Sequence, residues 1–200
     1  EKRTDILENQ TKQVALLQAE NVAAAKEYLL QGQDYYYRNI FPGPAAKAKV
    51  AVYLSFDNTA AANLGLPLPK GVMRIYKQDR SGSVQFVGED RIDHTPENET
   101  VRLQLGHAFD ITAERTQTDF KKLAGFAKYN YVFESGYRVA LKNGRDEAVE
   151  VRVVEPMPGD WEILSENHGH RKTGGSEAEW KIDVPPKGET ELLYRVKVKF

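Results

Sequence analysis

The chain has 200 residues, 40% of them apolar, with ten Tyr and eight Phe, which is the composition of a folded globular protein. Its 28 basic and 29 acidic side chains give a net charge of −1, so no overall positive field favours nucleic acid as a partner. The absence of cysteine excludes disulfides, thiolate-ligated zinc and a cysteine nucleophile, and no apolar run approaches the ~20 residues of a transmembrane segment.

The N-terminal stretch carries conflicting signals. Ala, Leu, Gln, Glu and Lys dominate residues 11–30 and favour a helix. Its apolar positions, however, form no clean helical stripe, and two strands around a turn at Glu20-Asn21 fit them equally well. Propensity and periodicity therefore leave both helix and strand open for residues 13–30.

From residue 47 onward the chain alternates as a half-buried strand does. Val50, Val52 and Leu54 fall on one face of this strand. A second strand is expected at Val72–Lys77, and a turn at Asp79–Gly82 leads into its return partner. These stretches predict a strand followed by a hairpin.

Alternation resumes at Val101, Leu103 and Leu105, and it is interrupted by Gly106. A glycine inside a strand pattern predicts a β-bulge or a close approach of two backbones. The charged stretch that follows, residues 112–126, is expected to link two halves of the chain.

The second half of the chain shows the same pattern of alternating stretches and turn signals as the first. Asn143-Gly144 is a strong hairpin signal, and the chain closes on an alternating run from Leu192 to Phe200. Turn signals every ~8–12 residues are typical of antiparallel sandwiches. We therefore predict an all-β fold with little helix, made of two tandem immunoglobulin-like β-sandwiches packed together. The expected parts are an N-terminal strand segment (1–45) that packs on the first sandwich, the first sandwich (46–125) and the second sandwich (126–200).

Two short stretches in the halves match each other. Residues 92–100 and 182–190 share Ile, Asp, Pro, Glu and Thr at a constant offset of 182 − 92 = 90. This match favours a tandem repeat, although Pro-x-x-Glu-Thr is also a common turn between strands. Beyond the turn, the apolar positions are odd-numbered in the first copy, as at Leu103, and even-numbered in the second, as at Leu192.

A group of polar residues in the first half has the residue types of an acid–base or divalent-metal site. The chain lacks a nucleophile elbow, a His-Glu-x-x-His pair and a glycine-rich phosphate loop, so no catalytic set is assembled and no cofactor is expected. One interpretation is a metal-dependent hydrolase centred on the Glu89–His94 loop, and the other is that these groups bond the loop's own backbone. The candidate cluster consists of Glu89, Asp90, Asp93, His94, His107 and Asp110.

A second metal candidate lies in the other half. His168 and His170 form a His-x-His pair, which on a strand would present both rings to one metal ion. Glu166 is too close in sequence to be a comfortable third ligand, and the neighbouring glycines favour a solvated loop.

Three consecutive aromatic residues, Tyr35, Tyr36 and Tyr37, form a further candidate site. In a strand, one of three neighbouring rings must face away from the other two. Part of this aromatic patch is therefore expected to be exposed for a partner, such as a protein or a glycan.

Several ordered motifs span most of the chain: NLGLPLPKG at 63–71, VGED at 87–90, HTP at 94–96, GHAFD at 106–110 and TQTDF at 116–120. With them the chain resembles the bacterial domain of unknown function 4139 family, the C-terminal part of mucoidy inhibitor A-like proteins. The resemblance implies a β-rich C-terminal module of a longer, exported cell-envelope protein, periplasmic or associated with the outer membrane. It also implies strand for Gln13–Leu30, and it brings no established catalytic residues.

These features predict a non-catalytic binding or architectural module of the cell envelope, without a transmembrane segment in this chain. Two alternatives stay open: the metal-dependent hydrolase, and a carbohydrate-binding module that uses the aromatic rings of residues 35–37.

Overall fold

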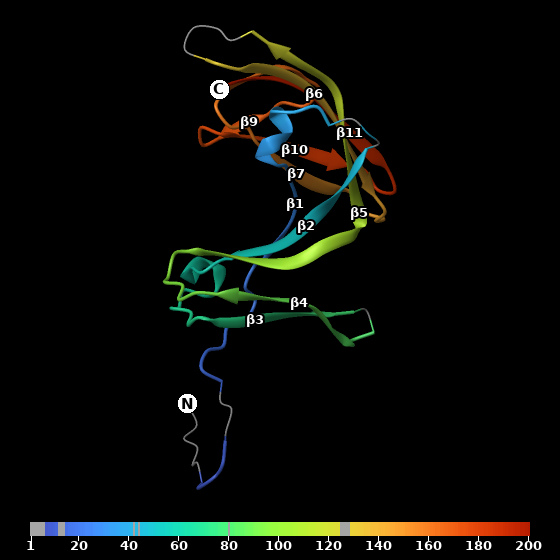
Figure 1. Ribbon diagram of the computed structural model, residues 1–200. Coiled ribbons are helices and arrows are strands. Elements are labelled where there is room, and N and C mark those ends of the chain that lie inside the picture. Colours follow the sequence, from blue (N-terminus) through green and yellow to red (C-terminus); the bar gives the residue numbers. More distant parts are fainter. Residues whose placement is uncertain (1–6, 12–14, 42, 44, 80, 125–128) are drawn as a thin grey trace.

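The computed structural model describes residues 7–11, 15–41, 43, 45–79, 81–124 and 129–200. This part of the chain is built from strands, with two short 3₁₀ helices, so the prediction of an all-β fold with little helix is confirmed (Figure 1). The elements are β1 (Ala25–Gln31), η1 (Asp34–Tyr37), β2 (Ala46–Asp57), η2 (Ala60–Ala62), β3 (Gly71–Gln78), β4 (Val84–Ile92), β5 (Thr100–Leu123), β6 (Val132–Asn143), β7 (Val149–Pro156), β8 (Asp160–Glu166), β9 (Arg171–Thr173), β10 (Glu177–Val184) and β11 (Glu189–Lys199).

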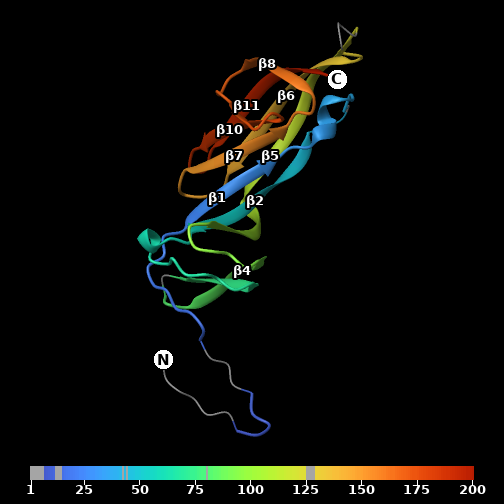
Figure 2. The ribbon, with the colours of Figure 1, turned by 90° about the vertical axis from the view of Figure 1, so that its left-hand side faces the viewer.

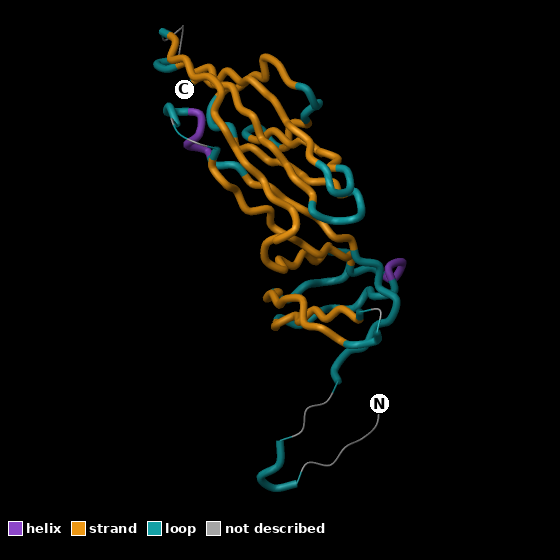
Figure 3. Tube along the Cα trace, turned by 90° about the vertical axis from the view of Figure 1, so that its right-hand side faces the viewer, coloured by secondary structure: helices purple, strands orange, loops and turns teal. Residues whose placement is uncertain are grey.

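Nine strands form one mixed sheet in the order β8-β11-β6-β5-β2-β1-β7-β10-β9, and β3 and β4 form a separate hairpin. Strand accounts for most of the trace in Figure 3. Neighbouring strands of the large sheet run antiparallel, except that β1 and β7 run parallel. The sheet curls over so that β6 and β11 face β7 and β10 across a shared core. The sandwich is therefore made from two parts of a single sheet.

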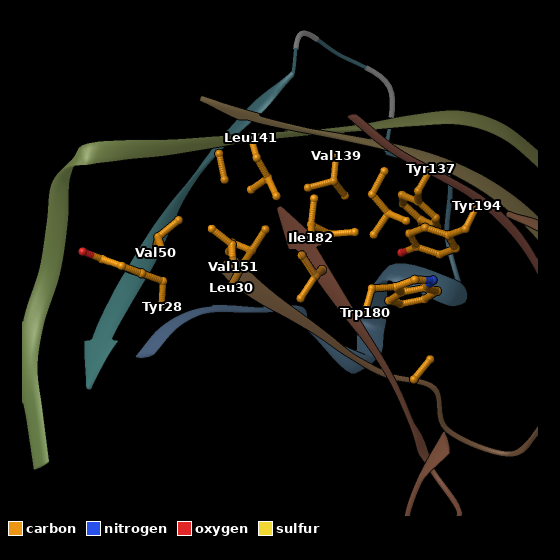
Figure 4. Close-up of a cluster of buried hydrophobic side chains, with 14 of the residues drawn as sticks. Tyr28, Leu30, Val50, Tyr137, Val139, Leu141, Val151, Trp180, Ile182 and Tyr194 are labelled. Atoms are coloured by element: carbon orange, nitrogen blue, oxygen red, sulfur yellow. The ribbon is translucent and has the colours of Figure 1, made fainter. Parts of the chain in front are cut away.

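The core consists of the alternating apolar side chains that the sequence indicates. Val139 and Leu141 of β6 point toward Val151 of β7 and Ile182 of β10, and all four are fully buried (Figure 4). Burying a side chain of this size contributes about 1.5–3 kcal/mol to folding. Leu103 is also buried, at 1% exposure, as its alternating position predicts.

The two expected sandwiches are not separate layers in the sheet order, because β1, β2 and β5 from the first half lie between β6 and β7 from the second. The cause is β5, which pairs with β2 through its first part and with β6 through its second part. Residues 112–123 thus belong to this strand, and the prediction of a linker there is wrong. The expected boundary after residue 125 lies outside the described residues.

A bulge forms where the sequence predicts it. Gly106 has a φ of 116°, and the register between β2 and β5 shifts beside it. Only glycine adopts this backbone conformation without strain. The bulge lies between the part of the sheet that encloses the core and the part that is next to the hairpin.

Strand structure in the N-terminal stretch begins later than expected. Residues 15–24 have neither helix nor strand, and β1 begins at Ala25. The strand prediction for Gln13–Leu30 is therefore correct only from Ala25 onward, and residues 13 and 14 lie outside the described residues. Before β1 the chain runs away from the sheet and past the hairpin (Figure 2). β1 itself has a strand partner on each side, which supplies its backbone hydrogen bonds.

The β3–β4 hairpin lies beside the large sheet, with β4 between β3 and β5 (Figure 1). Gly88 of β4 allows the close approach, because a Cβ at this position would lie 3.0 Å from the carbonyl oxygen of Leu105. Asp90 adds a hydrogen bond, accepting from the backbone N–H of Gln104 at 2.7 Å. One face of the hairpin is thus turned toward the sheet. No helix in the described part of the chain has the length and apolar character needed to span a bilayer.

Candidate binding surface

The sequence treats residues 89–94 as a loop, but Glu89 and Asp90 lie on β4, and only Asp93 and His94 follow the strand. Each of these polar residues has a separate structural contact. Glu89 pairs with Arg74 across the hairpin at 3.0 Å, and the contact of Asp90 with β5 is described above. The imidazole Nδ1 of His94 accepts a hydrogen bond from the backbone N–H of Lys70 at 3.3 Å. These groups hold the hairpin and its base in place.

Asp93 takes part through its backbone rather than its carboxylate. Its carbonyl oxygen accepts a hydrogen bond from the Thr95 hydroxyl at 3.0 Å. This is the bonding of a loop to its own backbone that the sequence offered as an alternative to catalysis.

His107 and Asp110 lie on β5, in a cavity of about 330 Å³ between the hairpin and the sandwich. Tyr28 and Arg145 line the same cavity, and Arg145 Nη1 lies 3.6 Å from the Asp110 carboxylate. The six candidate residues are therefore split between the hairpin and this cavity. Among the described residues, no three His, Asp or Glu side chains come together closely enough to hold a metal ion.

The His168–His170 pair lies in the loop between β8 and β9. His170 Nδ1 lies 3.0 Å from both carboxylate oxygens of Glu166, and its ring packs between Trp161 and Trp180 with centroid distances of 5.8 and 5.9 Å. The Glu166 carboxylate also accepts a hydrogen bond from Trp180 Nε1 at 2.8 Å. Glu166, which the sequence weighed only as a metal ligand, is thus the group that anchors this loop to the core.

The three consecutive tyrosines of η1 lie in different environments. Tyr35 is half-exposed, Tyr36 is half-buried against the Arg115 guanidinium, and Tyr37 is fully buried. The Tyr37 hydroxyl donates to the Glu155 carboxylate at 2.9 Å and lies 3.0 Å from the hydroxyl of Tyr194. Only Tyr35 is open enough for a partner.

A buried ionic network lies behind these tyrosines, and sequence analysis missed it. Arg115 of β5 is paired with Glu155 of β7, and both side chains are 5% exposed or less. Burial alone would lower the pKa of Arg115, but the Glu155 carboxylate, together with Tyr194 and Tyr37, outweighs it and raises that pKa. Burial and the same carboxylate raise the pKa of Tyr37 well above its usual value.

The one sequence signal for this network is Gly32. A Cβ at that position would lie 2.0 Å from a Glu155 carboxylate oxygen, so the carboxylate fills the space that any other side chain would need. Arg115 also donates to the Tyr194 hydroxyl at 3.2 Å. The charges are matched by partners inside the protein, so removing either partner would leave a buried charge uncompensated.

The face of the hairpin that is turned away from the sheet exposes large apolar side chains. Tyr76 of β3 stands opposite Phe86 of β4, and their rings meet edge to face at 5.6 Å between centroids. Tyr76, Val84 and Phe86 are 55%, 66% and 57% exposed. We call these three side chains the hairpin patch. The sequence predicts these residues to lie in paired strands. It does not predict their exposure, because alternation along a strand does not show which face is turned to the solvent.

No protein-family model, curated protein or solved structure matches the chain.

Proposed function

We propose that this chain is a non-catalytic binding module of a bacterial cell-envelope protein, and that it binds a protein partner through the hairpin patch. The envelope assignment, periplasmic or outer-membrane-associated, rests on the sequence motifs alone. The binding role rests on the surface described above.

The observation that carries the proposal is the exposure of Tyr76, Val84 and Phe86 on one face of two paired strands. Apolar side chains scattered singly over a surface need no partner, but a contiguous group on a sheet face loses favourable burial when it stays in water. Aromatic rings are also the side chains that most often dominate protein interfaces. A protein surface is the partner that covers such a flat apolar face best.

The other candidate functions have less support. The residues considered for a metal-dependent hydrolase are divided between two places and have structural contacts there. A carbohydrate-binding module at residues 35–37 would have a single open ring, because Tyr37 is buried and Tyr36 packs on Arg115. Sugar-binding platforms need more exposed ring surface than Tyr35 offers.

Site-specific photocrosslinking in cells that make the protein tests this proposal. A benzophenone side chain placed at Val84 is expected to give a discrete adduct with a second protein, because this position is the most exposed of the hairpin patch. The double substitution Tyr76→Thr and Phe86→Thr is expected to abolish the adduct while leaving the thermal unfolding temperature close to that of the wild type. Threonine keeps the strand propensity of the hairpin while removing its aromatic surface.

Phe109 provides a matched control, since it is the most exposed large apolar side chain among the described residues, at 93%, and it lies on β5 outside the patch. The same crosslinker at position 109 should give no adduct. If position 84 gave no adduct, or positions 84 and 109 gave the same one, the hairpin patch would not be the binding surface.

A further inference from the structure

Within the described part of the chain, the outer edge of β3 has no strand partner. β3 pairs with β4 alone, and β4 lies between β3 and the large sheet. A two-stranded hairpin is marginally stable in water, and an open edge presents unpaired backbone N–H and C=O groups to any extended chain. The register shift of the hairpin skips Val87 in β4, so β3 runs without interruption along its free side.

The edge carries positive charge. Between Lys70 and Gln78 the chain has three cations and no acidic residue. Arg74 is paired with Glu89, whereas Lys77 makes no ion pair with any described residue. The next acidic residue, Asp79, is engaged in the turn, where its carboxylate accepts hydrogen bonds from the backbone N–H groups of Ser81 and Ser83.

This charge argues against a second copy of the chain as the occupant. If two β3 strands paired with each other, their cations would lie along the same short interface, and like charges on paired strands are destabilising. A strand with acidic side chains would find cations opposite it instead. Its apolar side chains would extend the hairpin patch, because Tyr76 lies on β3 itself.

We infer that a partner protein adds an extended segment to the free edge of β3 as a third strand, and that this segment carries acidic residues together with apolar or aromatic ones. The inference rests on the proposed function, since it names the kind of protein segment that the hairpin binds. Backbone hydrogen bonds would supply affinity, and the side chains of the segment would supply selectivity.

Panning of a displayed library of random eight-residue segments, the length of β3, tests the inference on the full chain. Selected segments are expected to contain Asp or Glu together with apolar or aromatic residues. One selected peptide is then synthesised with alternate backbone amides methylated, once on each of its two edges. Methylation on one edge only should weaken binding about tenfold or more, because it removes the hydrogen bonds to β3.

Two double variants test the contribution of the positive charges and that of the aromatic side chains separately. Lys70→Glu with Lys77→Glu leaves the Arg74–Glu89 pair in place and should reverse the selection toward basic segments. Tyr76→Thr with Phe86→Thr should prevent enrichment altogether. Both variants should keep the far-ultraviolet spectrum and the thermal unfolding of the wild type.

The results distinguish a failure of the strand-addition inference from a failure of the proposed function. If the selected segments required Tyr76 and Phe86 but showed no acidic pattern and tolerated methylation on either edge, the hairpin would bind through its face, and strand addition would be wrong while the proposed function stood. If the chain formed a dimer that the Tyr76→Thr and Phe86→Thr changes dissolved, the occupant would be a second copy and the inference would be wrong. If no selected segment depended on the hairpin, strand addition would be wrong, and photocrosslinking at Val84 would decide the proposed function separately.

Discussion

Glu166 shows how one carboxylate anchors a loop. Partial burial would raise its pKa, but the hydrogen bonds from His170 and Trp180 outweigh this effect and lower the pKa below its usual value of 4.5. A group whose pKa is lower in the folded state stabilises the fold at pH values above the unfolded pKa. This stabilisation is lost as the pH falls through the lowered, folded-state pKa.

Glu166→Gln should therefore show a pH-dependent effect. As the pH falls below 4.5 and through the lowered pKa of Glu166, we expect the difference in unfolding temperature between the wild type and this variant to shrink. Thermal unfolding followed by circular dichroism measures the difference. Glu162→Gln removes a carboxylate from the same strand and should show no such narrowing; parallel curves for Glu166→Gln would refute the role of its carboxylate.

At the scale of elements, the loops before β5 and β11 are equivalent in structure. The amide of Asn58, at the end of β2, donates to the carbonyl oxygen of Pro96 at 2.8 Å, and that of Asn143, at the end of β6, donates to Pro185 at 3.0 Å. Both asparagines are buried. The offset between these prolines is 185 − 96 = 89, one less than the offset of the sequence match.

With an offset of 89, the apolar positions of the two halves also agree. Since 192 − 103 = 89, Leu103 is then equivalent to Leu192, and both side chains are buried. Asn98 and Lys187, again 89 apart, both have a positive φ. The sequence match thus identified two related loops, and the hydrogen bonds of the buried asparagines give their register.

The Arg115–Glu155 network ties four elements together, since it joins β5 and β7 to η1 and β11 through two tyrosines. Arg115→Met should cost about 3–5 kcal/mol of unfolding free energy, because it leaves the Glu155 carboxylate buried without its counter-charge. Arg115→Met combined with Glu155→Gln should recover most of this loss. Urea unfolding of the two variants measures both values.

The exposed pair Arg138–Glu191 is the matched control, since it also bridges two strands but lies in water. Arg138→Met should cost less than about 1 kcal/mol. Equal losses of unfolding free energy for Arg115→Met and Arg138→Met would show that burial of the ion pair does not determine the cost of breaking it.

At the scale of the whole molecule, β1 closes the sandwich. It pairs antiparallel with β2 on one side and parallel with β7 on the other, so it joins the two parts of the curled sheet. Its side chains Tyr28 and Leu30 enter the core. No described residue between 7 and 24 is part of that core.

Truncation tests this organisation. A chain that begins at Ala25 should unfold cooperatively with a free energy close to that of the full chain, because it keeps β1. A chain that begins at Gly32 should lose cooperative unfolding, since β2 and β7 would then have open edges inside the molecule. Leu30→Ala, which keeps the strand and removes one buried side chain, should cost about 2–5 kcal/mol. Cooperative unfolding of the chain without β1 would contradict the central role of this strand.

The sequence by itself determined the class of the fold, the bulge at Gly106 and the hairpin around residues 79–82, because strand alternation and turn chemistry are local properties. Only the tertiary structure decided that the strands share one sheet, since β5 pairs on both edges and β1 pairs with a strand more than a hundred residues away. The same holds for the candidate sites. Whether Tyr37 or Tyr76 is buried depends on which element covers it, and the pattern of neighbours along a chain does not carry that information.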